Sequence, residues 1–335
     1  MRIRLLTIVI WGEICLMGCV PSSSTVVPLV YSNIFPKDTT VILEKVPMYP
    51  AQFNPRCILL SNERILVRTS TLDNAVYSVF SYPEMKHLSY CGEQSEFIVP
   101  LEQFNDELYL VRNDSLYFYK WIEGDSLKLS STSFFCNIMG QQMLGVAKLN
   151  DNLYAYTNNC FDKGMNEFFM INLSQKQKEP KGVYPDTHVN FSSISDFKSA
   201  YAHEIIAKPD GSRLLVFYYR TRRCRIYNPN GVLLRDILLN YEPCQTIIDT
   251  DIKRRFLHIR DAYVTNNMIY LLCPDTKEAN SPSSLLVANW DGEFKAIYHL
   301  GQTISYFFID ELLNCFYGVN SNDPYHFYKL KLSKN

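Results

Sequence analysis

The feature that most restricts the fold of this chain is a strand–turn–strand unit that occurs six times along its 335 residues. Each unit consists of a short aromatic-rich run, a few polar turn residues and a second run. Within the runs, apolar and polar side chains alternate with the period of two that is typical of β-strands. The six units lie at 64–81, 107–121, 152–171, 213–227, 268–288 and 315–330. No segment keeps a helical period over several turns, so we expect little helix.

Two of the units are followed by a tight turn that opens a third strand. These turns carry Asn230-Gly231 and Asp291-Gly292, dipeptides that tolerate the positive φ angles of short hairpins. Repeats of roughly 40–60 residues with about four strands each are typical of β-propellers. We therefore predict an all-β, six-bladed β-propeller over residues 39–335, with a strand at 41–46 that joins the last blade and closes the ring. A pair of β-sandwiches is the competing architecture.

Composition agrees with this fold class and excludes one class of partner. Aromatic residues make up 14% of the chain, which suits β-sheet, and hydrophobic residues make up 47%, as in ordinary globular proteins. The net charge of −1 gives no bulk attraction to nucleic acid, so we expect no nucleic-acid partner. The densest basic cluster consists of Arg220, Arg222, Arg223 and Arg225. Because it separates two strand-like runs, we interpret it as a solvated hairpin turn rather than a phosphate site.

The amino terminus has the layout of a secretory signal peptide. Arg2 and Arg4 precede an apolar run over 5–17, which ends just before Cys19. The run is too short to span a bilayer, which takes about 20 apolar residues. Residues 16–19, Leu-Met-Gly-Cys, resemble the bacterial lipobox, and this resemblance implies cleavage before Cys19 and lipid attachment to its thiol. A hydrophobic first strand that ends in Gly-Cys by chance is the alternative.

The predicted lipid anchor determines the expected domain organisation and location. Residues 1–18 form the cleaved signal peptide, 19–38 form a lipidated tether that begins with a Pro/Ser-rich stretch, and 39–335 form the propeller. The acyl chains make the membrane itself a partner of the protein. We therefore expect the protein in a bacterial cell envelope, anchored to the outer membrane, with its body outside the cytoplasm.

Eight cysteines remain outside the predicted signal peptide and anchor. They are Cys57, Cys91, Cys136, Cys160, Cys224, Cys244, Cys273 and Cys315. An even number allows disulfides in an oxidising compartment, but eight cysteines can pair in 105 ways, so the pairing stays open. No two have CxxC spacing, which speaks against zinc binding and thioredoxin-like chemistry. Several lie in apolar strand runs, so we expect most of them to be small buried side chains.

The carboxyl-terminal third resembles a known family. Residues 268–272 (Met-Ile-Tyr-Leu-Leu), 287–292 (Val-Ala-Asn-Trp-Asp-Gly) and 316–319 (Phe-Tyr-Gly-Val) are similar to strand and turn patterns of the TolB-like six-bladed propellers, which occur as lipoproteins in Bacteroidota. Residues 92–100 resemble a Gly-rich segment of that family but lack most of its glycines. The resemblance implies a propeller fold and an envelope location, and it implies little about chemistry.

No pattern that would support catalysis or metal binding is present. The six histidines are scattered, and the chain has no Gly-x-Ser-x-Gly nucleophile motif. Asp249 and Asp251 would point the same way on a strand, but calcium or magnesium needs further oxygen ligands, so we interpret this pair as a solvated turn. We therefore assign no catalytic residue, no metal and no cofactor, and favour a non-enzymatic protein.

Propellers usually bind ligands in the central channel or at one of its mouths, where the inner strands converge. The polar residues expected on these strands, which we predict as ligand contacts, are His203, Glu204, Asp261, Tyr263 and Tyr306. We expect a non-enzymatic propeller that binds a protein or glycan of the envelope. The main alternative is a hydrolase or lyase, which requires at least three carboxylate or histidine side chains to converge at one channel mouth. A purely structural component, without a concave polar site, is the third possibility.

Replacing Cys19 by alanine tests the anchor. Without the thiol no acyl chain can be attached, so Cys19→Ala should abolish incorporation of labelled palmitate and release the protein from membranes. Palmitate labelling and fractionation of expressing cells measure both effects. Cys15→Ala, inside the predicted signal peptide, should behave like the parent chain. A Cys19→Ala protein that stays in the membrane fraction contradicts the prediction.

Overall fold

The structure is a computed structural model, and more than half of the chain that it describes is β-strand, with very little helix. The described residues are 27–32, 35–69, 75–93, 100–105, 107–112, 115–122, 125–135, 145–157, 166–185, 190–239, 256–274 and 281–333. Cys19, Asp249 and Asp251 lie outside them. The single helix within these ranges, α1 (Ile194–Ala200), begins after Ser193, whose hydroxyl accepts a hydrogen bond from the Asp196 amide. Within the same ranges, no helix has the length and apolar character needed to cross a membrane.

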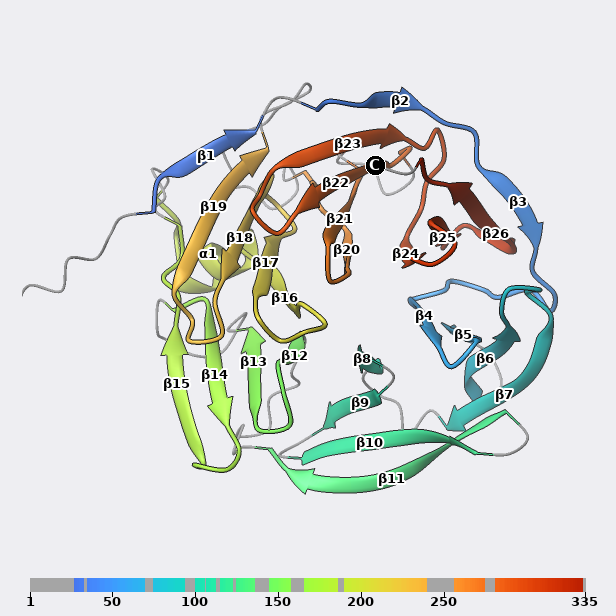
Figure 1. Ribbon diagram of the computed structural model, residues 1–335, viewed down its shortest axis with the longest axis horizontal. Helices are drawn as coiled ribbons and strands as arrows, with labels where there is room; N and C mark the ends of the chain where they lie inside the picture. Colours follow the sequence, from blue (N-terminus) through green and yellow to red (C-terminus); the bar gives the residue numbers. More distant parts are fainter. Residues whose placement is uncertain are drawn as a thin grey trace, which may run out of the picture.

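The described strands form six sheets that are arranged as blades around a central opening, so the predicted all-β, six-bladed β-propeller is confirmed (Figure 1). Blade 1 contains β4 (Cys57–Ser61), β5 (Arg64–Arg68), β6 (Ala75–Ser81) and β7 (His87–Glu93), and blade 2 contains β8 (Glu102–Phe104), β9 (Glu107–Arg112), β10 (Ser115–Ile122) and β11 (Ser126–Phe134). Blade 3 contains β12 (Val146–Lys148), β13 (Leu153–Thr157), β14 (Phe168–Asn172) and β15 (Gln177–Lys181), and blade 4 contains β16 (His203–Ala207), β17 (Leu214–Tyr218), β18 (Arg223–Tyr227) and β19 (Leu233–Leu239). Blade 5 contains β20 (Asp261–Val264), β21 (Met268–Cys273), β22 (Ser284–Asn289) and β23 (Phe294–His299), and blade 6 contains β24 (Tyr306–Asp310), β25 (Cys315–Asn320) and β26 (Asp323–Lys331).

The ring is closed by a strand from the other end of the chain. Strand β3 (Glu44–Pro47) pairs antiparallel with β26 and completes blade 6, as predicted for residues 41–46, although it begins three positions later and ends one later. Val46 lies opposite Phe327 in this pairing, so an apolar pair marks the junction. Closure of this kind leaves blade 6 with strands from both termini, and it fixes the first blade against the last.

Two further strands from the amino-terminal segment run along the outside of the ring. Strand β1 (Leu29–Ser32) pairs parallel with β19 on blade 4, and β2 (Asp38–Thr40) pairs parallel with β23 on blade 5 (Figure 1). The sequence gives no sign of these pairings, because a parallel edge strand needs no local turn. Residues 29–32, which belong to the predicted tether, are thus attached to the propeller.

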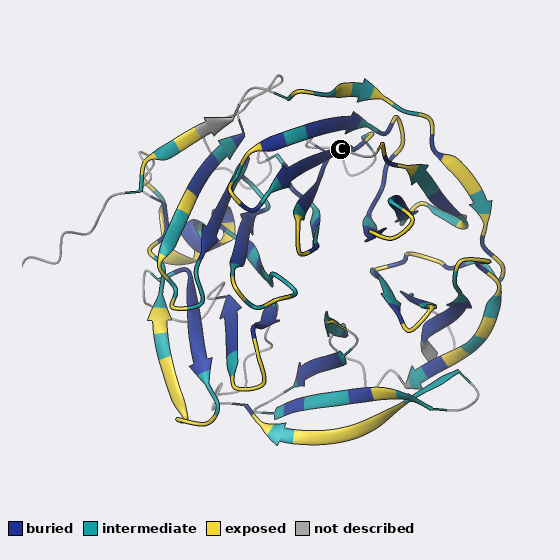
Figure 2. Cartoon of the chain, in the orientation of Figure 1, coloured by how far each residue is buried: buried dark blue, intermediate teal, exposed yellow. Residues whose placement is uncertain are grey.

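The hydrophobic core lies between the blades. Leu215 of β17 and Leu271 of β21 are both fully buried in one cluster that blades 4 and 5 share. Because both faces of a middle strand pack against neighbouring blades, β17 is buried at all of its positions and shows no alternation. The outermost strands β11 and β15 are largely exposed (Figure 2). The inner strands are therefore held in place by the apolar core that the middle strands form between the blades.

The arginine cluster lies at the hairpin turn between β17 and β18, as predicted, but the predicted solvation was wrong: none of its four arginines is exposed and two are buried. Arg222 and Arg225 are only 1% and 6% exposed. Arg223 donates hydrogen bonds to both carboxylate oxygens of Asp236, at 2.7 and 2.6 Å, and Arg225 Nη2 lies 2.8 Å from Asp236 Oδ2. Asp236 stands on the neighbouring strand β19 and supplies the countercharge that a local reading of the sequence does not show.

Glu167 extends this ion network to the interface between blades 3 and 4. Its carboxylate is fully buried, accepts hydrogen bonds from the hydroxyls of Tyr218 and Tyr227, and lies 3.1 Å from Arg225 Nη1. Burial raises the pKa of Glu167 to about 7, and the charge of Arg225 opposes this rise. The network satisfies buried charges on two blades at once, which is the condition under which burying them is tolerated.

The described cysteines agree with the expectation of small buried side chains. Cys57, Cys91, Cys224, Cys273 and Cys315 are free, and all but Cys57 are buried. The remaining three of the eight, Cys136, Cys160 and Cys244, lie outside the described residues.

Gly211 offers a test of how closely adjacent blades approach. It has a φ of +71°, and a Cβ added there would lie 2.1 Å from the carbonyl oxygen of Leu149 on blade 3. Gly301 has a φ of +63° but no atom within 4 Å of the added Cβ, so it is the matched control for backbone strain alone. Gly301→Ala should cost about 1 kcal/mol of unfolding free energy, and Gly211→Ala about 3 kcal/mol or more. Denaturant unfolding measures both, and equal costs would contradict the close approach.

Candidate functional site

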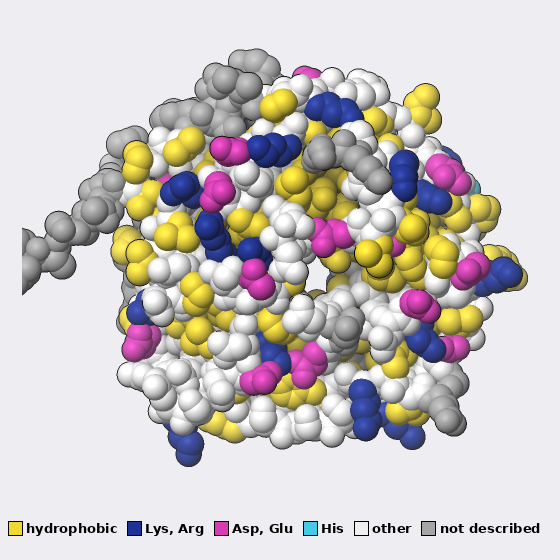
Figure 3. Space-filling view, in the orientation of Figure 1, with side chains coloured by type: hydrophobic (Ala, Val, Ile, Leu, Met, Phe, Trp, Pro, Cys, Tyr) yellow, Lys and Arg dark blue, Asp and Glu magenta, His cyan; other side chains and the backbone are white. Residues whose placement is uncertain are grey.

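A cavity of about 510 Å³ opens at one end of the central channel. It is lined by β4, β8, β16, β20 and β24 or by the turns that follow them, so five of the six blades contribute. The space-filling view shows the opening at the centre of the ring, with acidic side chains among those around it (Figure 3). A concave site built from several rigid strands is the default location for a ligand.

Side chains on four inner strands form two layers along the channel. Strands β4, β8, β16 and β20 each carry a titratable residue that faces the channel. Two positions further along, on the same face of the strand, each carries an apolar or aromatic residue. The first set, which we call the carboxyl layer, consists of Glu102, Glu204 and Asp261 with Cys57 beside them. The second set, the apolar collar, consists of Leu59, Phe104, Ile206 and Tyr263, all of which line the cavity. The collar is therefore nearer the mouth, and the carboxyl layer lies deeper.

Burial raises the pKa of all three carboxyl groups, and repulsion from neighbouring carboxylates adds to the rise at Glu102 and Asp261. Burial raises the pKa of Glu102 to about 8, and the charges of Glu204 and Asp261 add to the rise. Burial followed by repulsion from Glu204 holds the pKa of Asp261 well above its usual range. The amides of Ala262 and Phe307 donate to Asp261 at 3.0 and 3.2 Å and partly oppose this shift. At neutral pH the layer therefore keeps protons and can donate hydrogen bonds as well as accept them.

Glu204 is held by one aromatic neighbour. Burial raises the pKa of its carboxyl group, and a hydrogen bond with Tyr219 works in the opposite direction. Tyr306, on β24, is close to the same layer: burial raises its phenol pKa, and the charge of Asp261 adds to the rise. Arg260 lies next to Asp261 and Tyr306, and burial lowers the pKa of its guanidinium group. Among the described residues, two cations act on this part of the channel, Arg260 beside Asp261 and Tyr306 and Arg68 beside Cys57, against three carboxyl groups.

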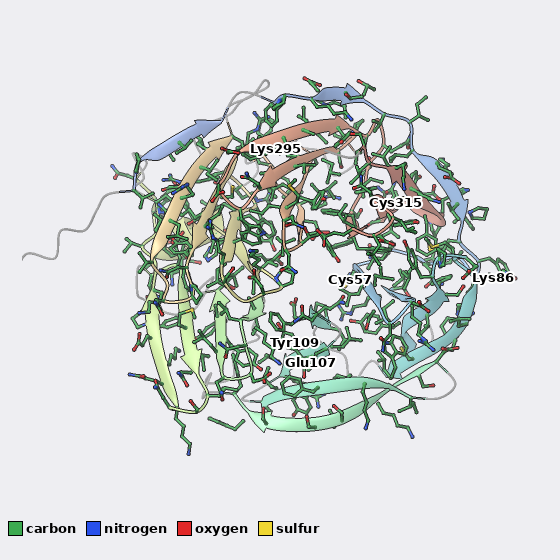
Figure 4. All side chains as sticks on the ribbon, viewed as in Figure 1. Cys57, Lys86, Glu107, Tyr109, Lys295 and Cys315 are labelled. Carbon is green, nitrogen blue, oxygen red and sulfur yellow. The ribbon has the colours of Figure 1, made fainter. Side chains whose placement is uncertain are left out.

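Cys57 lies beside the central opening on blade 1 (Figure 4). Burial, followed by the charges of Glu102 and Asp261, raises the pKa of its thiol. A thiol in such surroundings stays protonated and is a poor nucleophile. Among the described residues, no three His, Cys, Asp or Glu side chains are arranged to hold a metal ion.

The structure brings together most of the predicted ligand contacts. Glu204 and Asp261 belong to the carboxyl layer, Tyr306 lies beside this layer, and Tyr263 belongs to the collar. His203 is different: its side chain is fully buried away from the cavity, and its ring nitrogens lie 2.9 Å from the carbonyl oxygens of Tyr201 and Glu167. Burial lowers the pKa of His203 to about 4, so the ring is neutral. Ligand contact by these residues stays a prediction.

Sequence reasoning missed Glu102, which lies in the middle of the site. Its strand β8 has only three residues and pairs with β9 through a tight turn, so it does not stand out as a run. A usable signal exists in the spacing: Glu102 precedes Phe104 by two positions, as Glu204 precedes Ile206.

Together these observations define a six-bladed propeller with an acid-lined central channel. No protein-family model matches the chain, and no curated protein matches it. Solved structures with a similar fold include a protein of Bacteroides fragilis described as exported, with a TM-score of 0.54 at 10% identity, covering 92% of this chain and 100% of that one. A member of the DUF4221 family from Bacteroides vulgatus has a TM-score of 0.57 at 10% identity, with 86% and 97% covered. An auxiliary nutrient binding protein from Bacteroides ovatus has a TM-score of 0.50 at 10% identity, with 84% and 70% covered. These similarities establish the fold that the chain shares with them.

Replacing Glu102 by glutamine tests the carboxyl layer. The folded-state pKa of about 8 lies above the ordinary 4.5, so between these pH values the folded chain binds more protons than the unfolded one, and its stability falls as pH rises. Glutamine imitates the protonated carboxyl, so Glu102→Gln should lose this decline and be more stable than the parent at pH 8, by about 2 kcal/mol. Denaturant unfolding between pH 5 and pH 8 measures the slope. Glu84→Gln, in the exposed turn after β6, should keep the slope of the parent, and an unchanged slope in Glu102→Gln would refute the coupling.

Proposed function

We propose that this protein is a lipid-anchored envelope protein of the TolB-like propeller group, whose body lies outside the cytoplasm and binds a protein or glycan without chemical turnover. The binding site in this proposal is the cavity at the channel mouth. The observation that supports a binding role is the form of this cavity, which is open at one end and backed by an apolar core between the blades.

The proposed location is supported by independent observations. The signal-peptide layout and the lipobox-like residues before Cys19 support export and anchoring. One similar structure belongs to a protein described as exported, and another to an auxiliary nutrient binding protein. These likenesses, at 10% identity, agree with a binding propeller outside the cytoplasm and leave the bound molecule to the site itself.

A second candidate function, hydrolase or lyase, is favoured by the carboxyl layer. Three carboxyl groups from three blades converge there, and the raised pKa of Glu102 is what a general acid at neutral pH needs. Binding without turnover is the better supported function, because the neighbouring Cys57 thiol is held protonated and the neutral ring of His203 is fully buried outside the channel. The layer therefore has acids but no activated nucleophile among its described residues.

Filling the cavity tests the binding role. Ala207 lines the cavity at the end of β16, and a tryptophan there would occupy much of its volume. Ala207→Trp should weaken binding by at least about tenfold, because the ligand loses its site. Val232→Trp, on an exposed outer turn of blade 4, adds the same side chain away from the channel and should bind like the parent.

The measurement uses the full lipidated chain in detergent. A glycan array and cross-linking to purified envelope proteins identify a binder, and titration then gives the affinity of each variant. Unaltered affinity in Ala207→Trp, with unfolding shown to be normal, contradicts the proposed site. Turnover of an envelope glycan that Glu102→Gln abolishes would instead support the hydrolase or lyase.

A further inference from the structure

The charges around the cavity have one sign. Asp310 and Glu311 stand at the mouth and Glu102 at the inner end, while Lys, Arg and His are absent from the described residues that line it. Asp310 already accepts hydrogen bonds from the Tyr82 hydroxyl and, at 2.9 Å, from the Leu313 amide. A ligand that enters this cavity therefore meets acidic groups without a competing cation on the wall.

Two acidic side chains of the cavity wall, Glu102 and Glu311, have no side-chain partner among the described residues. Glu311 is exposed to solvent, so Glu102 is the enclosed acidic group left for a ligand. Asp261 receives two backbone amides and Glu204 receives the Tyr219 hydroxyl, whereas the carboxyl group of Glu102 has no hydrogen bond or ion pair with another described residue. Its oxygens are open to the cavity and not sealed inside the protein, so water or a ligand group solvates them. Glu102 also borders the cavity directly, so a ligand can reach it.

The collar limits what kind of molecule can deliver a cation to Glu102. Leu59, Phe104 and Ile206 offer no hydrogen-bond partners and Tyr263 offers a single hydroxyl, so a hydroxyl-covered sugar ring would leave most of its polar groups unsatisfied in the collar. An alkyl stem passes such a collar favourably, as the methylene groups of lysine and arginine do on apolar surfaces. Two residues along a strand span about 6–7 Å, which is close to the length of such a stem.

From these observations we infer that the cavity binds its ligand through an alkylammonium or alkylguanidinium group, with the stem in the apolar collar and the cationic head on Glu102. The inference rests on the proposed binding role of this cavity and specifies its chemistry. The same chemistry is found in a free aliphatic amine and in a lysine or arginine side chain on the surface of an envelope protein.

Binding of a cation at Glu102 is coupled to proton release. The groups that face Glu102 are Cys57 on β4, Tyr109 on β9, Glu204 on β16 and Asp261 on β20, with Tyr306 and Arg260 beyond Asp261. A nearby cation favours the charged carboxylate, so the bound ligand lowers the pKa of Glu102 from about 8 and expels its proton at neutral pH. Affinity for the amine should therefore rise from pH 6 to pH 8.

Pentylamine and 1-pentanol form a matched pair of probes, because they share the alkyl stem and differ in the cationic head. Titration calorimetry of the full chain at pH 8 should show pentylamine binding at least about tenfold more tightly than pentanol, the gain expected of a charge-assisted hydrogen bond. Glu102→Gln should remove the preference, and Glu84→Gln should keep it. Titrations of the unaltered protein at pH 7 in two buffers of different ionisation enthalpy should reveal proton release.

A second arm distinguishes the sources of the cation. A short peptide with one lysine, compared with the same peptide carrying norleucine, reports on a protein side chain, and pentylamine reports on a free amine. Tight binding of the lysine peptide alone assigns the site to a protein partner, and binding of pentylamine alone assigns it to a small amine.

Equal affinities for pentylamine and pentanol, or absence of proton release on amine binding, overturn the inference. If an envelope ligand then binds in a manner that Ala207→Trp abolishes but amines do not displace, the proposed binding role stands and only the cationic chemistry falls. If Ala207→Trp binds every ligand as the parent does, the cavity is not the site, and both proposals fall.

Discussion

The closed ring of this molecule depends on the pairing of β3 with β26. These two strands come from opposite ends of the chain, and their hydrogen bonds hold the last blade against the first. Without them the blades would still form, since each is a local meander, but the inter-blade cluster that joins blades 6 and 1 would open to water. The cavity is lined by residues from both of these blades, so its shape is a property of the closed ring.

The middle strands of each blade could be predicted from the sequence because their signal is local. Runs such as 213–218 and 224–227 alternate or are fully apolar, and turn residues separate them. The sequence signal is weaker for the innermost strands at the channel and for the outermost strands at the rim of the ring. Strand β8 is too short to form a run, and the parallel edge pairings of β1 and β2 depend on chain segments about 200 or more residues away. Long-range pairing leaves no mark in a local pattern.

The site was predictable in part, for the same reason. Glu204 and Asp261 could be placed on inner strands because each precedes a clear strand–turn–strand unit. His203 was placed with them, yet alternation turns it to the other face of β16, where carbonyl groups of Tyr201 and Glu167 hold it. The arginine cluster shows the converse. Its four basic residues look solvated in the sequence, but in the fold Arg223 pairs with Asp236 and Arg225 pairs with Glu167, two acids from other parts of the chain. Burial of a charge is decided by its partners, and partners are a tertiary property.

The amino-terminal strands also have a mechanical consequence. A pull on the chain ahead of residue 27 acts first on β1, whose backbone hydrogen bonds to blade 4 lie side by side along the strand. If β1 yields, the load passes to β2 on blade 5, and only after that to β3, the strand that closes the ring. The segment thus works as a series of short clamps, in which two can be lost before the circular body is strained. The circular body is thereby protected from tension applied at its amino-terminal side.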